Sequence, residues 1–376
     1  SMRSACNLLP LAALADDRDP HRDRGAAMSL SQVYVDLYTT SFKGQRAGGK
    51  KQRDEIQLDD RKQTPLTALE VALQHPALVL LGEPGSGKSS FTNHLLYLCA
   101  GALLDQKKNL LPKEWPQKQT LPVRFVLREL AVDLIKAEAE QWLQLSAEAR
   151  GRKLLELIFT HLKTRLEECQ AAGFCDDLQA QLRSGQCLVV LDGLDEVAVA
   201  QRHIMRAAIT ALRERLGPNR YIVTCRTRSW DDQHPLPAFH TSTLAHFTEE
   251  QVQQFVQHWY GALHEAKQFT QTEAQNRIDS MLAAIGTLER DLVANPLLLT
   301  TMAVVHYNDT KLPHERVKLY KRAAEVLLKR WQMHRAGQAG LLESLGISDS
   351  VLYPALYELA YTAHDSAKDK AAADLP

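Results

Sequence analysis

Residues 76–90 contain the feature that most constrains how this chain can fold. An apolar run from Ala77 to Leu81 is followed by Gly82-Glu83-Pro84-Gly85-Ser86-Gly87-Lys88-Ser89, which matches the pattern G-x-x-x-x-G-K-[ST], and then by an amphipathic stretch, Ser90 to Ala100. The apolar run predicts a buried strand and the amphipathic stretch predicts a helix. A glycine turn that fits the pattern by chance would not need this context. The chain is therefore expected to fold around a strand–loop–helix unit.

The residue types of this loop suit one chemical task, the binding of phosphate. Glycines allow successive backbone N–H groups to turn toward one phosphate, and the helix start adds the positive end of its dipole. Lys88 is expected to reach the β- and γ-phosphates of a nucleotide, and the Ser89 hydroxyl is expected to bind Mg²⁺.

Composition narrows the class of protein. The chain has 376 residues, which suggests two or three domains. Lys and Arg number 45, and Asp and Glu also number 45, so no overall positive field favours nucleic acid. The six cysteines form no C-x-x-C pair, which favours reduced thiols in a cytoplasmic protein. No apolar run approaches the ~20 residues of a membrane span. The stretch 8–15 faintly resembles a secretory signal, but a phosphate loop has no nucleoside triphosphate to bind outside the cell.

Hydrophobic patterns divide the rest of the chain into elements. Residues 1–30 are read as a flexible lead-in, 40–62 as a flexible loop and 105–120 as a further loop. Wholly apolar strands separated by helices predict a parallel sheet with helices on both faces. The strand at 221–225 is expected to lie between the phosphate-loop strand and the strand at 187–191. We expect strands at 33–38, 77–81, 121–127, 187–191, 221–225 and 240–247, and helices at 64–73, 90–100, 131–183 (interrupted at Gly173) and 202–216.

A second motif, Asp192-Gly193-Leu194-Asp195-Glu196, follows the apolar strand at 187–191. A carboxylate at the end of a buried strand needs a partner, and Mg²⁺ is the partner expected for Asp192. Asp195 and Glu196 are candidates for orienting an attacking water. They can also be solvated acids that begin a helix, where they favour the helix dipole. For Glu196 the two readings stay open.

A third motif, Thr224-Cys225-Arg226, ends the strand at 221–225. An arginine beside the phosphate-loop strand can neutralise a γ-phosphate, so Arg226 is a candidate sensor of the triphosphate. The alternative is an exposed arginine at a strand end. Arg228 lies two residues further on and is not separated from Arg226 by sequence alone.

Together these three motifs resemble the NACHT family of signal-transducing STAND ATPases, a group related to AAA+ proteins. The small residue after the first acid, with two acids beyond it, is that family's form of the second motif. Three further segments resemble the family. Residues 244–252 are similar to the start of its helical domain, and residues 312–331 are similar to its winged-helix region. Asn295-Pro296 is similar to its Gly-x-Pro-type site, without the glycine. On its own, Asn295-Pro296 is more often a helix start.

The resemblance implies a domain plan and a set of site residues. The plan is a lead-in at 1–30, a nucleotide-binding α/β domain at 31–247, a helical domain at 248–309 and a truncated winged-helix-like region at 310–376. It implies Mg²⁺ at Ser89 and Asp192, catalytic roles for Lys88, Asp195, Glu196 and Arg226, and adenine contact at Pro296. A histidine that holds ADP in relatives has only His306 and His314 as candidates. ATP or ADP would bind to Gly82, Glu83, Pro84, Gly85, Ser86, Gly87, Lys88, Ser89 and Ser90.

The function that this resemblance implies is a switch with slow, Mg²⁺-dependent ATP hydrolysis. ADP would hold a closed monomer, and exchange for ATP would open it and permit homo-oligomerisation. Bacterial relatives resemble animal NLR receptors and commonly act in innate immunity against phage. The trigger, such as a phage-derived molecule, and the effector output would belong to flanking domains, so the chain is expected to be a core fragment of a larger protein.

Two other functions fit parts of the sequence. A remodelling or motor ATPase of the AAA+ group would show sustained turnover stimulated by a polymer. A nucleic-acid-binding module could use the basic helix of the winged-helix region, but Glu315 and Glu325 interrupt that helix, which favours a solvated face. Its basic residues are Lys318, Lys321, Arg322, Lys329 and Arg330.

Overall fold

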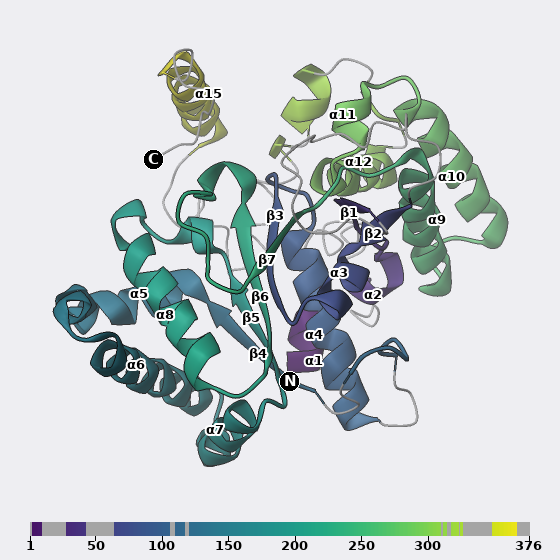
Figure 1. Cartoon of the computed structure of the whole chain (residues 1–376). Coiled ribbons are helices and arrows are strands. Elements are labelled where there is room, and N and C mark those ends of the chain that lie inside the picture. Colours follow the sequence, from purple (N-terminus) through teal and green to yellow (C-terminus); the bar gives the residue numbers. More distant parts are fainter. Residues whose placement is uncertain are drawn as a thin grey trace. The chain divides into compact units, whose positions relative to one another are not determined.

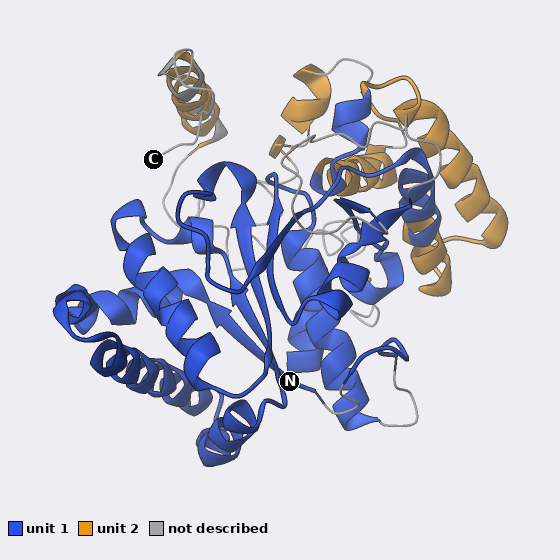
Figure 2. Cartoon of the chain, in the orientation of Figure 1, with its two compact units in different colours: residues 1–8, 29–258, 290–297 blue, residues 9–28, 259–289, 298–376 orange. Residues whose placement is uncertain are grey.

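A computed structural model of the chain describes most of the residues that carry these motifs. The described residues are 2–9, 28–42, 64–105, 110–116, 120–309, 311–313, 317–322, 324–325 and 348–366. His314, Lys329, Arg330 and residues 43–62 of the loop expected at 40–62 lie outside them, whereas residues 40–42 of that expected loop belong to a strand, Tyr38–Phe42. The chain divides into unit 1, residues 1–8, 29–258 and 290–297, and unit 2, residues 9–28, 259–289 and 298–376 (Figure 2).

Unit 1 is built on a parallel sheet, in which the structure describes five strands in the order β4-β5-β6-β3-β7 (Figure 1). The strands are β3 (Ala77–Gly82), β4 (Leu121–Val126), β5 (Cys187–Asp192), β6 (Arg220–Arg226) and β7 (His240–Thr243). The predicted parallel sheet is therefore confirmed, and β6 lies between β3 and β5 as expected. The last strand is shorter than the predicted 240–247. Because all strands run the same way, their carboxyl ends meet at one edge of the sheet.

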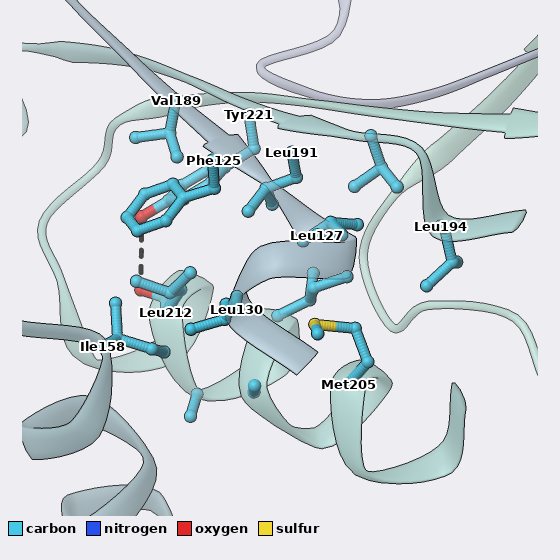
Figure 3. Close-up of a cluster of buried hydrophobic side chains, with 14 of the residues drawn as sticks. Phe125, Leu127, Leu130, Ile158, Val189, Leu191, Leu194, Met205, Leu212 and Tyr221 are labelled. Atoms are coloured by element: carbon cyan, nitrogen blue, oxygen red, sulfur yellow. Dashed lines mark hydrogen bonds between the residues drawn. The ribbon is translucent and has the colours of Figure 1, made fainter. Parts of the chain in front are cut away.

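Helices cover both faces of the sheet, which is why β3 and β5 are buried along their whole length. One face packs against α5 (Leu127–Lys136), α6 (Ala147–Glu168), α7 (Cys175–Ser184) and α8 (Arg202–Arg215), and the break at Gly173 falls between α6 and α7 as predicted. Figure 3 shows this core, in which Phe125, Leu191 and Met205 are fully buried and the Tyr221 hydroxyl donates to the Leu212 carbonyl oxygen at 3.2 Å. The opposite face packs against α4 (Lys88–Leu104).

The segment before the phosphate loop differs from the prediction. Residues 33–38 are not a strand: α2 spans Leu30–Val33, and β1 spans Tyr38–Phe42. The alternation that suggested a strand reflects burial of Val35 and Leu37, while Asp36 offers its carbonyl oxygen to the Gln251 side chain. Alternating burial thus arose here without strand pairing across those residues.

A second correction concerns the helix expected at 64–73. Pro65 lies in β2 (Pro65–Thr67), which pairs antiparallel with β1, and helix α3 begins at Ala68 and ends at Gln74. The helix starts there because the Thr67 hydroxyl accepts the Glu70 N–H at 3.1 Å, and the Glu70 carboxylate accepts the Thr67 N–H at 2.8 Å. This capping box fixes the helix start more firmly than a proline in the first turn. Farther upstream, α1 (Met2–Cys6) packs against α4.

Unit 2 is helical in its described part. It contains α10 (Gln271–Ile285), α15 (Asp349–Ser366), residues 259–265 of α9 (Glu249–Glu265) and residues 298–309 of α12 (Pro296–Asp309). The short helix α11 (Arg290–Val293) belongs to unit 1. Trp259, Met281 and Val304 are fully buried and form part of its core. No helix in the described residues has the length and apolarity that a membrane crossing requires.

Two sequence candidates lie inside unit 2. His306 is fully buried, with its Nδ1 2.5 Å from the Tyr260 hydroxyl and its Nε2 3.2 Å from the Ser280 hydroxyl. Burial lowers the pKa of this imidazole to about 4. Both ring nitrogens are engaged within the helical core, so this geometry favours a structural histidine over one that holds ADP. In the basic helix, Arg322 pairs with Asp309 and Glu325, which neutralises one of the charges offered to nucleic acid.

Candidate functional site

The phosphate loop follows β3 and leads directly into α4, as the sequence predicts. Gly85 and Gly87 have φ of 77° and 95°, a left-handed backbone that glycine adopts without strain. A Cβ at Gly82 would lie 2.4 Å from the Ser86 hydroxyl, so a side chain at this position would have to displace that hydroxyl. The loop therefore has the tight, inward-turned backbone that wraps an anion.

Two side chains of the loop fit a phosphate ligand. The Ser86 hydroxyl is buried and has no hydrogen-bond partner among the described residues, and a buried donor of this kind is costly unless a ligand meets it. The Lys88 ammonium donates to the carbonyl oxygens of Gly82 at 2.6 Å and Glu83 at 3.0 Å. Burial lowers the pKa of Lys88, the Asp195 charge opposes that shift, and Arg226 adds to it. Lys88 is thus a partly desolvated cation inside the loop.

The second motif lies at the carboxyl end of β5. Asp192 is buried, and its Oδ1 accepts a hydrogen bond from the Thr224 hydroxyl at 2.7 Å, while that hydroxyl accepts the Gly193 N–H at 2.8 Å. Its Oδ2 lies 2.5 Å from Arg124 Nη2. The Asp192 carboxylate is therefore held from both neighbouring strands, by Thr224 of β6 and Arg124 of β4.

Asp195 and Glu196 differ in their surroundings. Both Asp195 carboxylate oxygens are engaged by Arg226, Oδ1 by its backbone N–H at 3.0 Å and Oδ2 by its Nε at 2.9 Å. Glu196 is exposed and pairs with Arg128 at 3.2 Å, a surface pair worth little energy. Asp195 is thus built into the edge of the sheet, whereas Glu196 lies at its surface.

Arg226 lies level with Gly82 in the pairing of β6 with β3, so the arginine follows the same sheet edge as the start of the loop. Arg228 lies in the short turn after β6. The register separates the two arginines, which the sequence did not, because only Arg226 is both paired with Asp195 and level with the phosphate loop.

A segment far along the sequence contacts the phosphate loop. The Asn295 side-chain amide donates to the Pro84 carbonyl oxygen at 3.0 Å, and the Leu297 N–H donates to the Gly85 carbonyl oxygen at 3.2 Å. The Asn295 Oδ1 also accepts the Leu297 N–H at 3.0 Å, and α12 begins at Pro296. The helix-start reading of Asn295-Pro296 is therefore confirmed, and the residues on either side of Pro296 bond to the loop. Contact of Pro296 with adenine stays a prediction.

Sequence reasoning gave no role to three residues that hold this site together. Arg124 and Thr224 donate to the Asp192 carboxylate, and Arg202 donates to the Asp195 carbonyl oxygen at 2.8 Å. One signal could have found Arg124: a charge in the middle of a buried strand needs a partner, and Asp192 ends the neighbouring strand. The contacts of Thr224 and Arg202 depend on sheet register and helix placement, which the sequence pattern does not give.

The donor set also fits a magnesium ion bound with a nucleotide. Among the described residues, no group of three or more His, Cys, Asp and Glu side chains could hold a metal ion by itself. Mg²⁺ on a nucleotide takes only one or two protein oxygens, with phosphate and water supplying the others. Exposed Ser89, on the first turn of α4, and buried Asp192 supply oxygens of that kind.

Comparison with known proteins agrees with this geometry. Residues 77–262, from β3 into α9, match the family model of the NACHT domain. Comparison with curated proteins gives no match. The matched segment contains the phosphate loop, the Asp192 motif and Arg226. This chain therefore contains a NACHT domain at residues 77–262, and NACHT domains are P-loop nucleoside triphosphatases of the STAND kind.

Proposed function

We propose that the chain is the core of an ATP/ADP-dependent STAND switch whose Mg²⁺-dependent hydrolysis is slow. The observation that carries this proposal is the convergence on one sheet edge of the phosphate loop, Asp192 and the Arg226–Asp195 pair. The Ser86 hydroxyl, which has no hydrogen-bond partner among the described residues, supports binding of a phosphate chain there. Gly82 to Ser90 bind the nucleotide, and Ser89 and Asp192 hold the metal ion. These are the assignments that the sequence motifs suggest.

The catalytic assignments follow from the surroundings of each group. Lys88 can leave its loop carbonyls for the β- and γ-phosphates, which are stronger acceptors. Arg226 contacts the γ-phosphate, and Asp195 holds Arg226 in position for that contact. Glu196 is the exposed acid of the motif and orients water. Mg²⁺, when bound, neutralises charge on the phosphate chain.

Two features support coupling of the nucleotide to the helical region, which a switch requires. Asn295 and Leu297 bond directly to carbonyl oxygens of the loop, so a nucleotide that changes the loop would also change the start of α12. The domain plan of 31–247, 248–309 and 310–376 gives such a change a helical domain to move. Contact of Pro296 with adenine, which the family resemblance implies, is part of this proposal.

The wider role rests on resemblance. Homo-oligomerisation on activation, a trigger such as a phage-derived molecule, innate immunity as the setting and the cytoplasm as the compartment follow from the family. The six cysteines are all free thiols, which suits a reducing compartment.

The test measures three quantities: the nucleotide that the purified protein retains, the rate of ATP turnover, and the molecular mass of the protein with each nucleotide. Wild-type protein should retain ADP through purification, turn over ATP slowly in a single-turnover assay, and change its light-scattering mass when ADP is replaced by a non-hydrolysable ATP analogue. Lys88→Ala should lose these responses while keeping its circular dichroism spectrum. Rapid turnover with no change of mass would favour a motor and contradict the switch.

A further inference from the structure

Arg124 lies in the middle of β4, a strand that is otherwise apolar around it. Its Nη2 donates to Asp192 Oδ2 at 2.5 Å, and the arginine side chain is 32% exposed while the aspartate side chain is 11% exposed. A short, partly desolvated pair of this kind is among the stronger hydrogen bonds in proteins. Arg124 thus meets the acid assigned to the metal ion.

The two carboxylate oxygens of Asp192 have different roles. Oδ1 is held by Thr224, whose hydroxyl is fixed in turn by the Gly193 N–H. Oδ2 receives only the Arg124 guanidinium among the hydrogen bonds between described residues. Because Thr224 is buried and the Arg124 side chain is partly exposed, Oδ2 is the oxygen on the accessible side, and a metal ion or its bound water approaching Asp192 would use it.

Arg124 is held at the site through its bond to Asp192. Its Nε is buried and has no hydrogen-bond partner among the residues that the structure describes. The arginine side chain is also partly open to solvent, so its charged end can leave Asp192 without losing a network of other bonds.

We propose that Arg124 is an internal cation that competes with the divalent metal ion for Asp192 Oδ2, and so sets the metal affinity of the site. This inference rests on the proposed function, because it takes Asp192 as a metal-holding residue. When the metal ion binds beside a nucleotide, Arg124 swings toward solvent. When the metal ion leaves, Arg124 returns and prevents an uncompensated buried carboxylate, which is costly. Arg124 is thereby a positioning residue that acts through Asp192.

The neighbouring pair offers a matched control. Arg128, four residues further along the chain, pairs with Glu196 at 3.2 Å, and both side chains are exposed. Arg124→Gln and Arg128→Gln each remove one positive charge from the same edge of the unit. Only the first removes the occupant of Asp192 Oδ2, so the comparison separates competition from a general change in charge.

The experiment measures binding of Mn²⁺, as a probe for Mg²⁺, by electron paramagnetic resonance on the full chain with a non-hydrolysable ATP analogue. Nucleotide binding without metal is measured in parallel by a fluorescent analogue. Arg124→Gln should bind Mn²⁺ about tenfold more tightly than wild type, the scale of one charge-assisted hydrogen bond. Arg128→Gln should stay within about twofold, as expected for an exposed pair. Arg124→Lys keeps the charge but not the planar fork, and should bind Mn²⁺ about threefold more tightly; it also serves if Arg124→Gln does not fold.

The outcomes separate this inference from the function on which it rests. Nucleotide binding by wild type, with unchanged or weaker Mn²⁺ binding in both Arg124 variants, overturns the competition. An equal rise in Arg128→Gln also overturns it, because the effect would then be one of charge alone. Failure of folded wild-type protein to bind nucleotide at all contradicts the proposed function, and this inference with it.

Discussion

Thr224→Val replaces a buried hydroxyl by a methyl group of similar size at the centre of the site. Thr224 is 2% exposed, so no solvent can replace the lost hydrogen bonds. The variant removes the donor to Asp192 Oδ1 at 2.7 Å, a bond to a charged acceptor worth about 1.5–3 kcal/mol. It also leaves the Gly193 N–H without its acceptor, at a cost of about 1–3 kcal/mol. Because the two bonds share one hydroxyl, we expect a combined loss of about 3 kcal/mol in the free energy of unfolding of unit 1.

Thr224→Ser is the matched control, because it keeps the hydroxyl and removes only a methyl group, at a cost of about 1 kcal/mol. The assay is urea denaturation of both variants and wild type, followed by near-UV circular dichroism, with hydrogen exchange of the β5–Gly193 peptide as a local readout. The valine variant should unfold at lower urea than the serine variant and exchange faster at this peptide. If the valine variant is as stable as the serine variant, the hydroxyl network does not hold Asp192 as described.

Three further perturbations test other parts of the account. Gly85→Ala adds a Cβ 2.6 Å from the Asn295 Oδ1 in a left-handed backbone. It should lower the free energy of unfolding, measured by thermal denaturation, by at least about 1–2 kcal/mol and weaken nucleotide binding. Gly173→Ala has open space around it and should be close to neutral, and equal effects of the two variants would contradict the role of the loop backbone. Asp195→Asn loosens the pair with Arg226 and should slow ATP turnover at least about tenfold with little change in nucleotide affinity, whereas equal losses of both would mean that Asp195 serves binding. Burial lowers the pKa of His306 to about 4, so the unfolded chain takes up this proton first as pH falls. The free energy of unfolding should therefore decrease between pH 6.5 and 4, by at most about 3 kcal/mol. Thermal unfolding of His306→Gln should depend less on pH in that range, and an unchanged pH dependence would exclude His306 as the cause.

The sequence predicted the sheet well because the two strands that precede the phosphate loop and the Asp192 motif are buried along their whole length, and each motif follows or ends a strand. Asp192 and Arg226 could be assigned to one sheet edge from this rule alone, and the register confirms that Arg226 is level with Gly82. The insertion of the strand at 220–226 between the two motif strands was also predictable, since a further strand had to separate them.

Prediction was weaker where local signals compete. Pro65 suggested a helix start, but the reciprocal bonds of Thr67 and Glu70 place it three residues later. The alternation of apolar and polar residues at 33–38 predicts a strand, but it arises from burial of side chains beneath other elements. The pairing of Arg124 with Asp192 requires the register of two strands, and the contact of Asn295 with Pro84 joins residues that lie 211 positions apart. Such contacts are set by tertiary packing and leave little trace in a local pattern.

The account depends on one claim, that the loop at 82–89 binds the phosphate chain of an adenine nucleotide. Isothermal titration calorimetry of nucleotide-free protein with ATP, with and without Mg²⁺, tests it most directly. We predict saturable binding by wild type at one site per chain and loss of that binding in Lys88→Ala, with the fold retained. Absence of heat for folded wild-type protein, or equal binding by Lys88→Ala, would contradict the account.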